Sequence, residues 1–353
     1  MTSSPAAPTS APHSANGAGV LVVGAGIAGL ACARALRDAG VPVRVVDRGR
    51  RPGGRMAGRT LHGRTVDLGA SYFTVPDGSA FGEVVARWEG KGLAHPWSDT
   101  FTVLDAHGTG GGSPLESSRT TTGPMRYAAV GGLRSLLVDL AEELGADEER
   151  RVDVQLEQAV TSVHHDGTVD GSDDGVRYDT VVLAMPEPQA ARLLAPGSVV
   201  AAALDTNAWE PTIAVALGFA ERTWPADLHG AFVEASVVVS FLADDGDRRG
   251  DGAPVLVAHT TAGFAREHLE HPDGAVEAVV AEVSALLGLG ESARPVWNHA
   301  HRWTYARTTA SHPEPFALHE RIGVCGDAWG DRSSVPTAWA SGDALGRAIA
   351  ARR

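Results

Sequence analysis

The stretch of sequence that decides the fold is residues 20–30, which read VLVVGAGIAGL. In it an apolar run leads directly into the spacing Gly-x-Gly-x-x-Gly, and a helical pattern over residues 30–39 follows and stops at Gly40. A second apolar run, residues 41–46, ends in Asp47. The order of strand, tight turn, helix, strand and carboxylate predicts a dinucleotide-binding βαβ unit, which is the core of a doubly wound α/β fold.

Each glycine of this unit has its own expected role. Gly24 permits the tight turn, Gly26 lets the backbone approach a pyrophosphate, and Gly29 allows the helix to pack closely on the strand. The first helical residues, Ile27 and Ala28, present free N–H groups and a partial positive charge to the phosphates.

The carboxylate at the end of the second strand points to a ribose. Asp47 is placed to accept hydrogen bonds from the ribose hydroxyls, and it disfavours a 2′-phosphate because two negative charges repel each other. The unit by itself fits either NAD or FAD, so the choice between them depends on the rest of the chain.

Three further segments resemble FAD-containing amine oxidases and their relatives. Residues 47–56, DRGRRPGGRM, resemble the second signature of these enzymes, and residues 66–74, VDLGASYFT, resemble a stretch beside the isoalloxazine ring. The third segment comprises GVCGD at 323–327 and TAWASG at 337–342. The resemblance implies a non-covalent FAD that is contacted by Arg48, Gly54, Arg55, Met56, Ala70, Ser71, Tyr72, Val160, Gly326, Asp327, Thr337 and Ala338.

Some of these contacts have specific implied roles. By the resemblance, Asp327 binds a ribityl hydroxyl or a phosphate-bound water, and the backbone of Val160 binds the adenine. The helix after Asp327 directs its positive N-terminus at flavin N1 and C2=O, where negative charge collects when the flavin is reduced.

Other segments are most similar to renalase and the bacterial renalase-like flavoproteins. They are GGRM, DLGASYFT, VVLAMPEPQ at 181–189, VAHT at 257–260, REHLE at 266–270 and HRWTYA at 301–306. This resemblance runs from about residue 20 to the C-terminus. It implies a Rossmann-like FAD-binding domain with a mostly parallel, doubly wound sheet, and an inserted α+β substrate domain built on a mixed sheet.

The order of the motifs predicts a discontinuous arrangement. Residues 19–74, 124–204 and 316–353 are expected to form the FAD-binding domain, and residues 75–123 and 205–315 the substrate domain. Residues 1–18, rich in Ser, Ala and Pro, are expected to be a disordered tail.

Local patterns add three expectations. Residues 159–163 and 176–183 are expected to pair as a hairpin, and the His-His-Asp of residues 164–166 to lie at a turn rather than at a metal site. The Gly- and Asp-rich segments 105–114 and 244–254 are expected to be exposed hairpin loops.

Composition narrows the class of partner. The 353 residues carry a formal net charge of −13, which disfavours nucleic acid and anionic membrane surfaces. No uninterrupted apolar segment approaches the ~20 residues needed to cross a bilayer, so the expected location is the cytoplasm. Cys32 and Cys325 are expected to be small buried residues, and no cluster of metal ligands is expected.

The reaction depends on what donates electrons to the flavin. Monoamine and polyamine oxidases typically have a lysine near flavin N5 and paired tyrosines at the ring face. Here the only lysine, Lys91, lies in the first insertion, and the segment after Asp327 offers Trp329 and Trp339. The renalase resemblance instead implies a small-molecule substrate, a 2- or 6-dihydro isomer of NAD(P), which gives hydride to flavin N5. Dioxygen then takes the electrons, and H2O2 and NAD(P)+ result.

Three alternatives stay open. The first two are a flavin amine oxidase and another FAD-dependent dehydrogenase or desaturase. The third is a non-catalytic flavin-binding redox sensor.

His259, Tyr72 and Trp303 are the residues expected to face the substrate. His259 lies in the matched VAHT segment, and its alternative role is that of a hydrogen-bonded histidine at a strand end. Trp303 and Tyr305 alternate as in a strand, so they share a face that either walls the pocket or packs in the core. Arg302 either attracts a substrate phosphate or is solvated at a strand edge.

Overall fold

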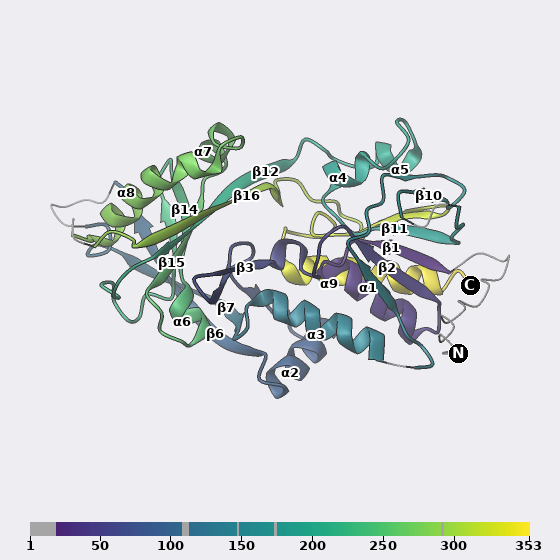
Figure 1. Cartoon of the computed structure of the whole chain (residues 1–353), viewed down its shortest axis with the longest axis horizontal. Helices are drawn as coiled ribbons and strands as arrows, with labels where there is room; N and C mark the ends of the chain where they lie inside the picture. Colours follow the sequence, from purple (N-terminus) through teal and green to yellow (C-terminus); the bar gives the residue numbers. More distant parts are fainter. Residues whose placement is uncertain (1–18, 108–112, 147, 173–174, 291–292) are drawn as a thin grey trace, which may run out of the picture.

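The computed structural model describes residues 19–107, 113–146, 148–172, 175–290 and 293–353. The predicted tail, residues 1–18, lies outside the described residues. Two sheets, one in each half of the molecule, organise the chain (Figure 1). Within these ranges the structure contains no helix that is both long and apolar enough to cross a membrane.

The first sheet is the predicted doubly wound one. It has six strands in the order β17 (Ala317–His319), β18 (Ile322–Val324), β11 (Thr180–Leu183), β1 (Val20–Val23), β2 (Val43–Asp47) and β8 (Asp153–Leu156). All neighbouring strands are parallel except β17 and β18. The central strands are short apolar runs without alternation because both faces of the sheet are covered.

Helices cover one face of this sheet. They are α1 (Ile27–Asp38), α2 (Ala80–Gly90), α3 (Leu133–Ala146) and α9 (Val335–Ala350), and their apolar sides share one buried cluster with β1 and β2. α1 and α9 approach closely because α9 carries glycines at the contact. A Cβ at Gly342 would lie 2.0 Å from the Ala28 carbonyl oxygen, and one at Gly346 would lie 2.6 Å from that of Cys32.

The other face of the sheet carries smaller elements, namely α4 (Glu187–Ala191), α5 (Val199–Ala202), β9 (Ser162–Val163) and β10 (Val169–Asp170). The predicted hairpin of residues 159–163 with 176–183 is wrong. β9 pairs with β10, while β11 lies between β1 and β18 as a parallel strand. Residues 164–168 form the turn between β9 and β10, which confirms the turn expected at His164.

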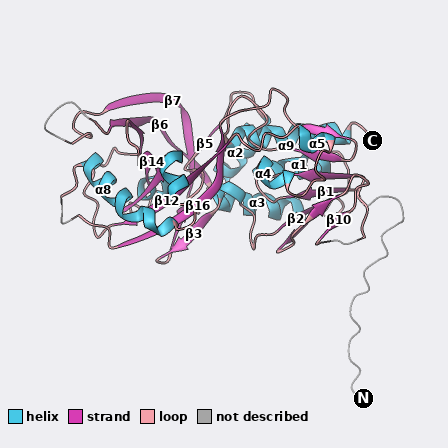
Figure 2. Ribbon diagram, turned by 90° about the horizontal axis from the view of Figure 1, so that it is seen from above, coloured by secondary structure: helices cyan, strands magenta, loops and turns pink. Residues whose placement is uncertain are grey.

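The second sheet is mixed, as the resemblance implied. Its eight strands follow the order β16 (Trp297–Thr308), β12 (Trp209–Gly218), β15 (Val255–Thr260), β14 (Val239–Asp244), β13 (Gly230–Glu234), β6 (Ala94–Asp105), β7 (Arg119–Ala129) and β5 (Phe73–Thr74). Its pairs are antiparallel apart from β13 with β6. Seen from above, this strand-rich half lies beside the helix-rich half (Figure 2).

Short elements complete the second half. They are α6 (Asp245–Arg249), α7 (Ala262–Glu267), α8 (Val276–Leu287), the 3-10 turn η2 (Pro272–Ala275), and the hairpin of β3 (Gly58–Leu61) with β4 (Arg64–Asp67); a second 3-10 turn, η1 (Gly54–Met56), packs with the first half. α8 packs its apolar side on the sheet. The predicted domain boundaries stay a prediction, since α2 lies in the expected insertion and packs with α1 and α3.

Residues 244–254 are not the exposed loop that their Gly and Asp content predicted. They include α6, where Asp244, Asp245, Arg248 and Arg249 are all buried. Their charges are compensated by one another and by residues distant in the sequence, namely Arg64 and Asp67 of β4 and Arg222, and the run of polar letters does not reveal these pairs. Part of the other expected loop, residues 108–112, lies outside the described residues.

Candidate functional site

A single large cavity of ≈ 1940 Å³ runs between the two sheets and is lined from both halves. Pockets for one drug-sized ligand usually measure about 300–1,000 Å³. The cavity therefore has room for a dinucleotide and a second small molecule. Of the residues predicted to bind cofactor or substrate, all line this cavity except Gly29 and Thr337.

The nucleotide end begins at the N-terminus of α1. Gly24 has φ +117°, and a Cβ at Gly29 would lie 1.9 Å from the Gly24 carbonyl oxygen. These two positions need glycine for the protein's own packing, as predicted. A Cβ at Gly26 would instead have Gly54 Cα as its nearest neighbour, at 3.9 Å. Its space opens on the cavity, which fits close approach of a pyrophosphate.

Asp47 joins the end of β2 to the glycine turn. Its Oδ2 accepts a hydrogen bond from the Ala25 N–H at 2.7 Å, and its Oδ1 accepts one from the Gly49 N–H at 2.6 Å. A carboxylate has about four lone-pair directions, so acceptor capacity remains for a ribose. A Cβ at Gly49 would lie 2.9 Å from Asp47 Oδ1, which explains why glycine follows the acid so closely.

An arginine–carboxylate pair joins two motifs that are far apart in the sequence. Arg55 Nη1 donates to Asp327 Oδ2 at 2.8 Å, and Arg55 Nη2 donates to Asp327 Oδ1. The guanidinium also lies 5.2 Å from the ring centroid of Trp209, and Ser333 Oγ donates to Asp327. The sequence placed Arg55 and Asp327 near one cofactor, and the structure adds that they bind each other.

The N-terminus of α9 lies at the same cavity. Ser334 caps the helix by accepting a hydrogen bond from the Thr337 N–H at 3.3 Å, and the two hydroxyl oxygens are 2.7 Å apart. Thr337 thus bonds to the capping Ser334 and does not line the cavity, whereas Ala338 does. Cys325, just before this segment, is buried and free, as is Cys32.

The opposite end of the cavity is aromatic. Tyr72 lies with its ring centroid 5.4 Å from that of Phe101 and 6.1 Å from that of Phe241. Phe232 and Phe241 line the cavity beside it. This grouping offers flat, apolar surfaces that suit a planar ring.

His259 is a buried polar group at this end whose hydrogen bonding is incomplete. Its Nε2 is buried and has no partner among the described residues. Burial, assisted by the charge of Arg248, lowers its pKa to about 4, so the imidazole is neutral near pH 7. No protein group satisfies this nitrogen in the part of the chain that the structure describes, and His259 lines the cavity, so the nitrogen is available to a bound molecule.

Strand β16 contributes the next wall. Trp303 Nε1 donates to the Leu68 carbonyl at 2.6 Å, and Arg192 donates to the Tyr305 hydroxyl. Both rings line the cavity, which favours the wall over the core. Arg302 Nη1 donates a hydrogen bond to the Leu269 carbonyl oxygen at 2.6 Å. Burial, followed by the charge of Arg59, lowers the pKa of His301 to about 4.

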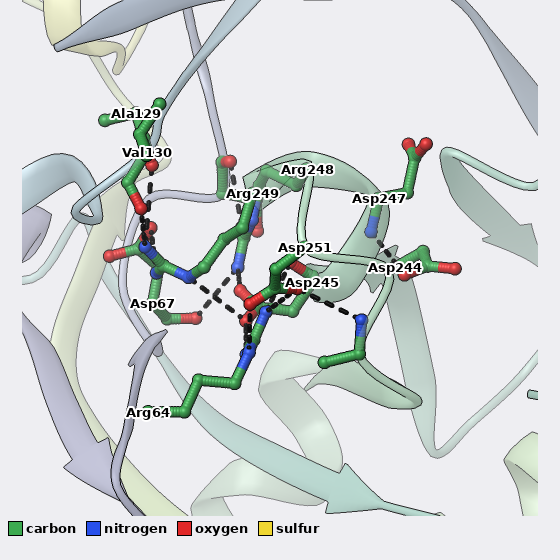
Figure 3. Close-up of polar contacts among 12 residues, drawn as sticks. Arg64, Asp67, Ala129, Val130, Asp244, Asp245, Asp247, Arg248, Arg249 and Asp251 are labelled. Atoms are coloured by element: carbon green, nitrogen blue, oxygen red, sulfur yellow. Dashed lines mark hydrogen bonds and ion pairs between the residues drawn. The ribbon is translucent and has the colours of Figure 1, made fainter. Parts of the chain in front are cut away.

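Sequence reasoning missed a buried ion cluster beneath the site, formed by Arg64, Asp67, Asp245, Arg248 and Arg249 (Figure 3). Asp245 pairs with Arg64, Arg248 and Arg249. Burial opposes its ionisation, but the three guanidinium groups together lower its pKa. Arg249 Nη2 reaches Asp67 Oδ2 at 2.9 Å.

The Asp245 cluster supports the cavity wall. Arg248 Nη1 donates to the Ser71 carbonyl at 2.9 Å, and Asp67 Oδ1 accepts from the Leu133 N–H at the start of α3 at 3.1 Å. The cluster therefore connects the second sheet to the segment that includes Tyr72. The sequence did hold a signal for this cluster. Residues 244–251 read DDGDRRGD, and Asp245 precedes Arg248 by three positions and Arg249 by four, which is the spacing of ion pairs on a helix.

Comparisons with known proteins agree with this geometry. Residues 22–88 match the NAD(P)-binding Rossmann-like domain, and residues 98–344 match the flavin containing amine oxidoreductase family. A phytoene desaturase (neurosporene-forming) from Rhodobacter capsulatus is 51% identical over 57 residues, 16% of this chain and 11% of that protein. Protein FLOWERING LOCUS D from Arabidopsis thaliana is 37% identical over 86 residues, 23% of this chain and 11% of that protein.

Solved structures share the fold at low identity. A putative protoporphyrinogen oxidase from Exiguobacterium sp. 255-15 has a TM-score of 0.74 and 17% identity, with 95% of this chain and 99% of that chain covered. Cyclohexylamine oxidase from Brevibacterium oxydans IH-35A has a TM-score of 0.72 and 17% identity, with 94% and 98% covered. The family match spans more than half of the chain, which therefore belongs to the flavin-containing amine oxidoreductases and is an FAD-dependent oxidoreductase.

Proposed function

We propose that the protein is a renalase-like oxidase of the cytoplasm that acts on 2- or 6-dihydro isomers of NAD(P). In the overall reaction the dihydronicotinamide loses a hydride, and dioxygen receives two electrons and two protons. One of these protons derives from the hydride and one from solvent, and the products are NAD(P)+ and H2O2.

The observation that carries the proposal is the position of Lys91. This lysine, the only one in the chain, ends α2 and places its Nζ 2.6 Å from Asp139 Oδ1. It does not line the cavity. The lysine typical of monoamine and polyamine oxidases thus has no counterpart at the substrate end. A dihydronicotinamide needs none, because loss of hydride leaves an aromatic cation and no proton has to be abstracted.

The substrate end supports a nicotinamide in two further respects. Tyr72, Phe232 and Phe241 provide apolar surfaces for a flat ring. Neutral His259 holds an unpaired Nε2 that can donate a hydrogen bond to, or accept one from, a carboxamide. Trp303 is fixed by its bond to the Leu68 carbonyl and so keeps the shape of the wall.

The residues at the nucleotide end hold and orient the cofactor. FAD, when bound, supplies the hydride acceptor. The backbone of Gly26 and the first turn of α1 suit its pyrophosphate, and Asp47 suits a ribose. Arg55 and Asp327 fix each other, so the segments before and after the substrate half keep their spacing.

The test is anaerobic mixing of the purified yellow protein with 6-dihydroNAD. We expect the flavin absorbance to bleach within seconds, and we expect peroxide to form once air is admitted. Ordinary 4-dihydroNAD, putrescine and benzylamine serve as comparisons and are expected to react much more slowly.

Each of the other outcomes would point to a different activity. Bleaching by an amine and not by the nicotinamide isomers would replace the proposal with an amine oxidase. Bleaching by none of these donors, in a protein that chemical reductants do bleach, would favour a desaturase-like enzyme or a redox sensor.

A further inference from the structure

One cation at the substrate end is unexplained by cofactor binding or by ion pairing. Arg126 lies on β7 and is 7% exposed, yet it lines the cavity. Its one hydrogen bond is a long one, from Nη1 to the Ser98 carbonyl at 3.5 Å. In the part of the chain that the structure describes, no carboxylate forms an ion pair with it.

The guanidinium is held by aromatic rings. Its Cζ lies 4.0 Å from the ring centroid of Phe101 and 5.5 Å from that of Tyr72. These rings fix the plane of the guanidinium but do not satisfy its five N–H donors. The nitrogens of Arg126 are not among the fully buried atoms that lack a partner, so the free donors reach the cavity.

The pairing of β6 with β7 is irregular beside Arg126. Ser98 on β6 pairs with Arg126, and the register shifts on both sides of Ser98. Such bulges re-aim side chains and are frequent beside active sites. Pro124, two residues earlier on the same face of β7, also lines the cavity.

The electrostatics at this end leave Arg126 uncompensated. The other polar side chains here include His259 and His301, which can be neutral or cationic and so supply no counter-charge; with pKa values of about 4 they are neutral near pH 7. Burying a cation without a counter-charge is costly, and a bound anion removes that cost. By contrast, Arg248, the next buried arginine, is paired with Asp245.

We propose that Arg126 is the anion-binding residue of the substrate end and that the substrate carries a phosphate or carboxylate. The inference rests on the proposed function only in that a dihydronicotinamide nucleotide carries such a group. It sets this cavity apart from one that selects a cationic amine, because an ammonium group beside Arg126 would be repelled.

The first test measures binding without turnover. Benzoate and benzamide have nearly the same shape and differ in charge, and phenyl phosphate separates phosphate from carboxylate. Each is titrated into the holoprotein, with the flavin spectrum and calorimetric heat as readouts. We expect benzoate or phenyl phosphate to bind tighter than benzamide by on the order of 10- to 100-fold, as for a hydrogen-bonded charge pair.

Arg126→Gln should remove this preference and leave benzamide binding unchanged, and Arg126→Lys should retain part of it. Arg119→Gln is the matched control, since Arg119 lies on the same strand, is exposed, and pairs with Glu234 outside the cavity. Equal binding of the anions and benzamide by the wild type would overturn the inference. So would an equal weakening of all three ligands in Arg126→Gln, because that is the result of a purely structural role.

A second test separates this inference from the proposed function. In Arg126→Gln, the KM for 6-dihydroNAD should rise on the order of tenfold or more, and the KM for uncharged 1-methyl-1,6-dihydronicotinamide should rise much less. If neither donor reduces the wild-type flavin, the proposed function fails. The benzoate titration then decides about Arg126 by itself.

Discussion

The two ends of the cavity are built by different means. At the nucleotide end, backbone and glycines provide much of the surface, and its central turn, with Gly24 and Gly26, is one short stretch of sequence that Asp327 joins from far downstream. At the substrate end, side chains from strands distant in the sequence meet, among them β7, β14, β15 and β16, and the buried ion pairs of α6 support the wall behind them. The comparison teaches that the first end depends on the shape of the backbone, whereas the second depends on compensation of charge.

The largest expected effect follows from removing the carboxylate of Asp245, which is the centre of the buried ion cluster behind the substrate end. Asp245→Ala leaves buried Arg248 without its carboxylate partner and leaves Arg249 with Asp67 alone, and we expect the free energy of unfolding to fall by about 3–5 kcal/mol. Asp251→Ala is the control, because Asp251 contacts the same Arg64 but is 43% exposed at its side chain. It should cost no more than about 1 kcal/mol. Urea unfolding of both variants measures the difference, and equal losses would refute a special role for burial.

The next effect is a pH dependence of stability at the substrate end. The pKa of His259 is about 4 in the folded protein against 6.5 for a free histidine, so only the unfolded chain takes up this proton between the two values. Stability should therefore fall as the pH is lowered from 6.5 to 4, by about 3 kcal/mol at most from this residue. His259→Gln should flatten the slope in unfolding experiments at pH 7 and pH 5. An unchanged slope would mean that His259 is not buried as described.

A pair of glycine substitutions tests the nucleotide end. Gly29→Ala brings a Cβ within 1.9 Å of the Gly24 carbonyl oxygen and should destabilise the fold by about 1–3 kcal/mol or more, with or without FAD. Gly26→Ala has 3.9 Å of room, so the apoprotein should keep its stability while its affinity for FAD falls. Thermal unfolding of apoprotein and FAD titration distinguish the two. A destabilised Gly26→Ala apoprotein would contradict the assignment.

The smallest effect concerns Thr337, which, like Gly29, was predicted to contact the cofactor but does not line the cavity. Thr337→Val removes a hydroxyl that bonds to Ser334, and it should cost less than about 1 kcal/mol while leaving FAD affinity unchanged. A large loss of FAD in this variant would restore Thr337 to the cofactor site.

The same contrast explains how much the sequence could predict. The parallel sheet and the residues at the nucleotide end follow from local spacing, because one glycine turn and one acid define the unit. The substrate end does not. Asp67 and Arg249 are 182 positions apart, and nothing local shows that they pair. The hairpin of residues 159–163 with 176–183 was wrong for a related reason, since β11 pairs with β1 and β18 instead.

Arg126 shows the remaining limit. In the sequence it is one arginine among many. Only the fold shows that it lies against aromatic rings, lines the cavity and has no carboxylate partner among the described residues. Tyr72, His259 and Trp303 were expected from motif resemblance, but their orientation depended on strands far apart in the chain.

The close packing of α1 on α9 has a consequence for biosynthesis. The helix that presents the first glycine turn is covered by a helix translated some three hundred residues later, with Gly342 and Gly346 seated on it. At about 5–20 residues per second, a ribosome leaves that surface bare for tens of seconds. We therefore expect the flavin nucleotide to be captured only after α9 has been synthesised, and the apolar side of α1 to stay uncovered until then.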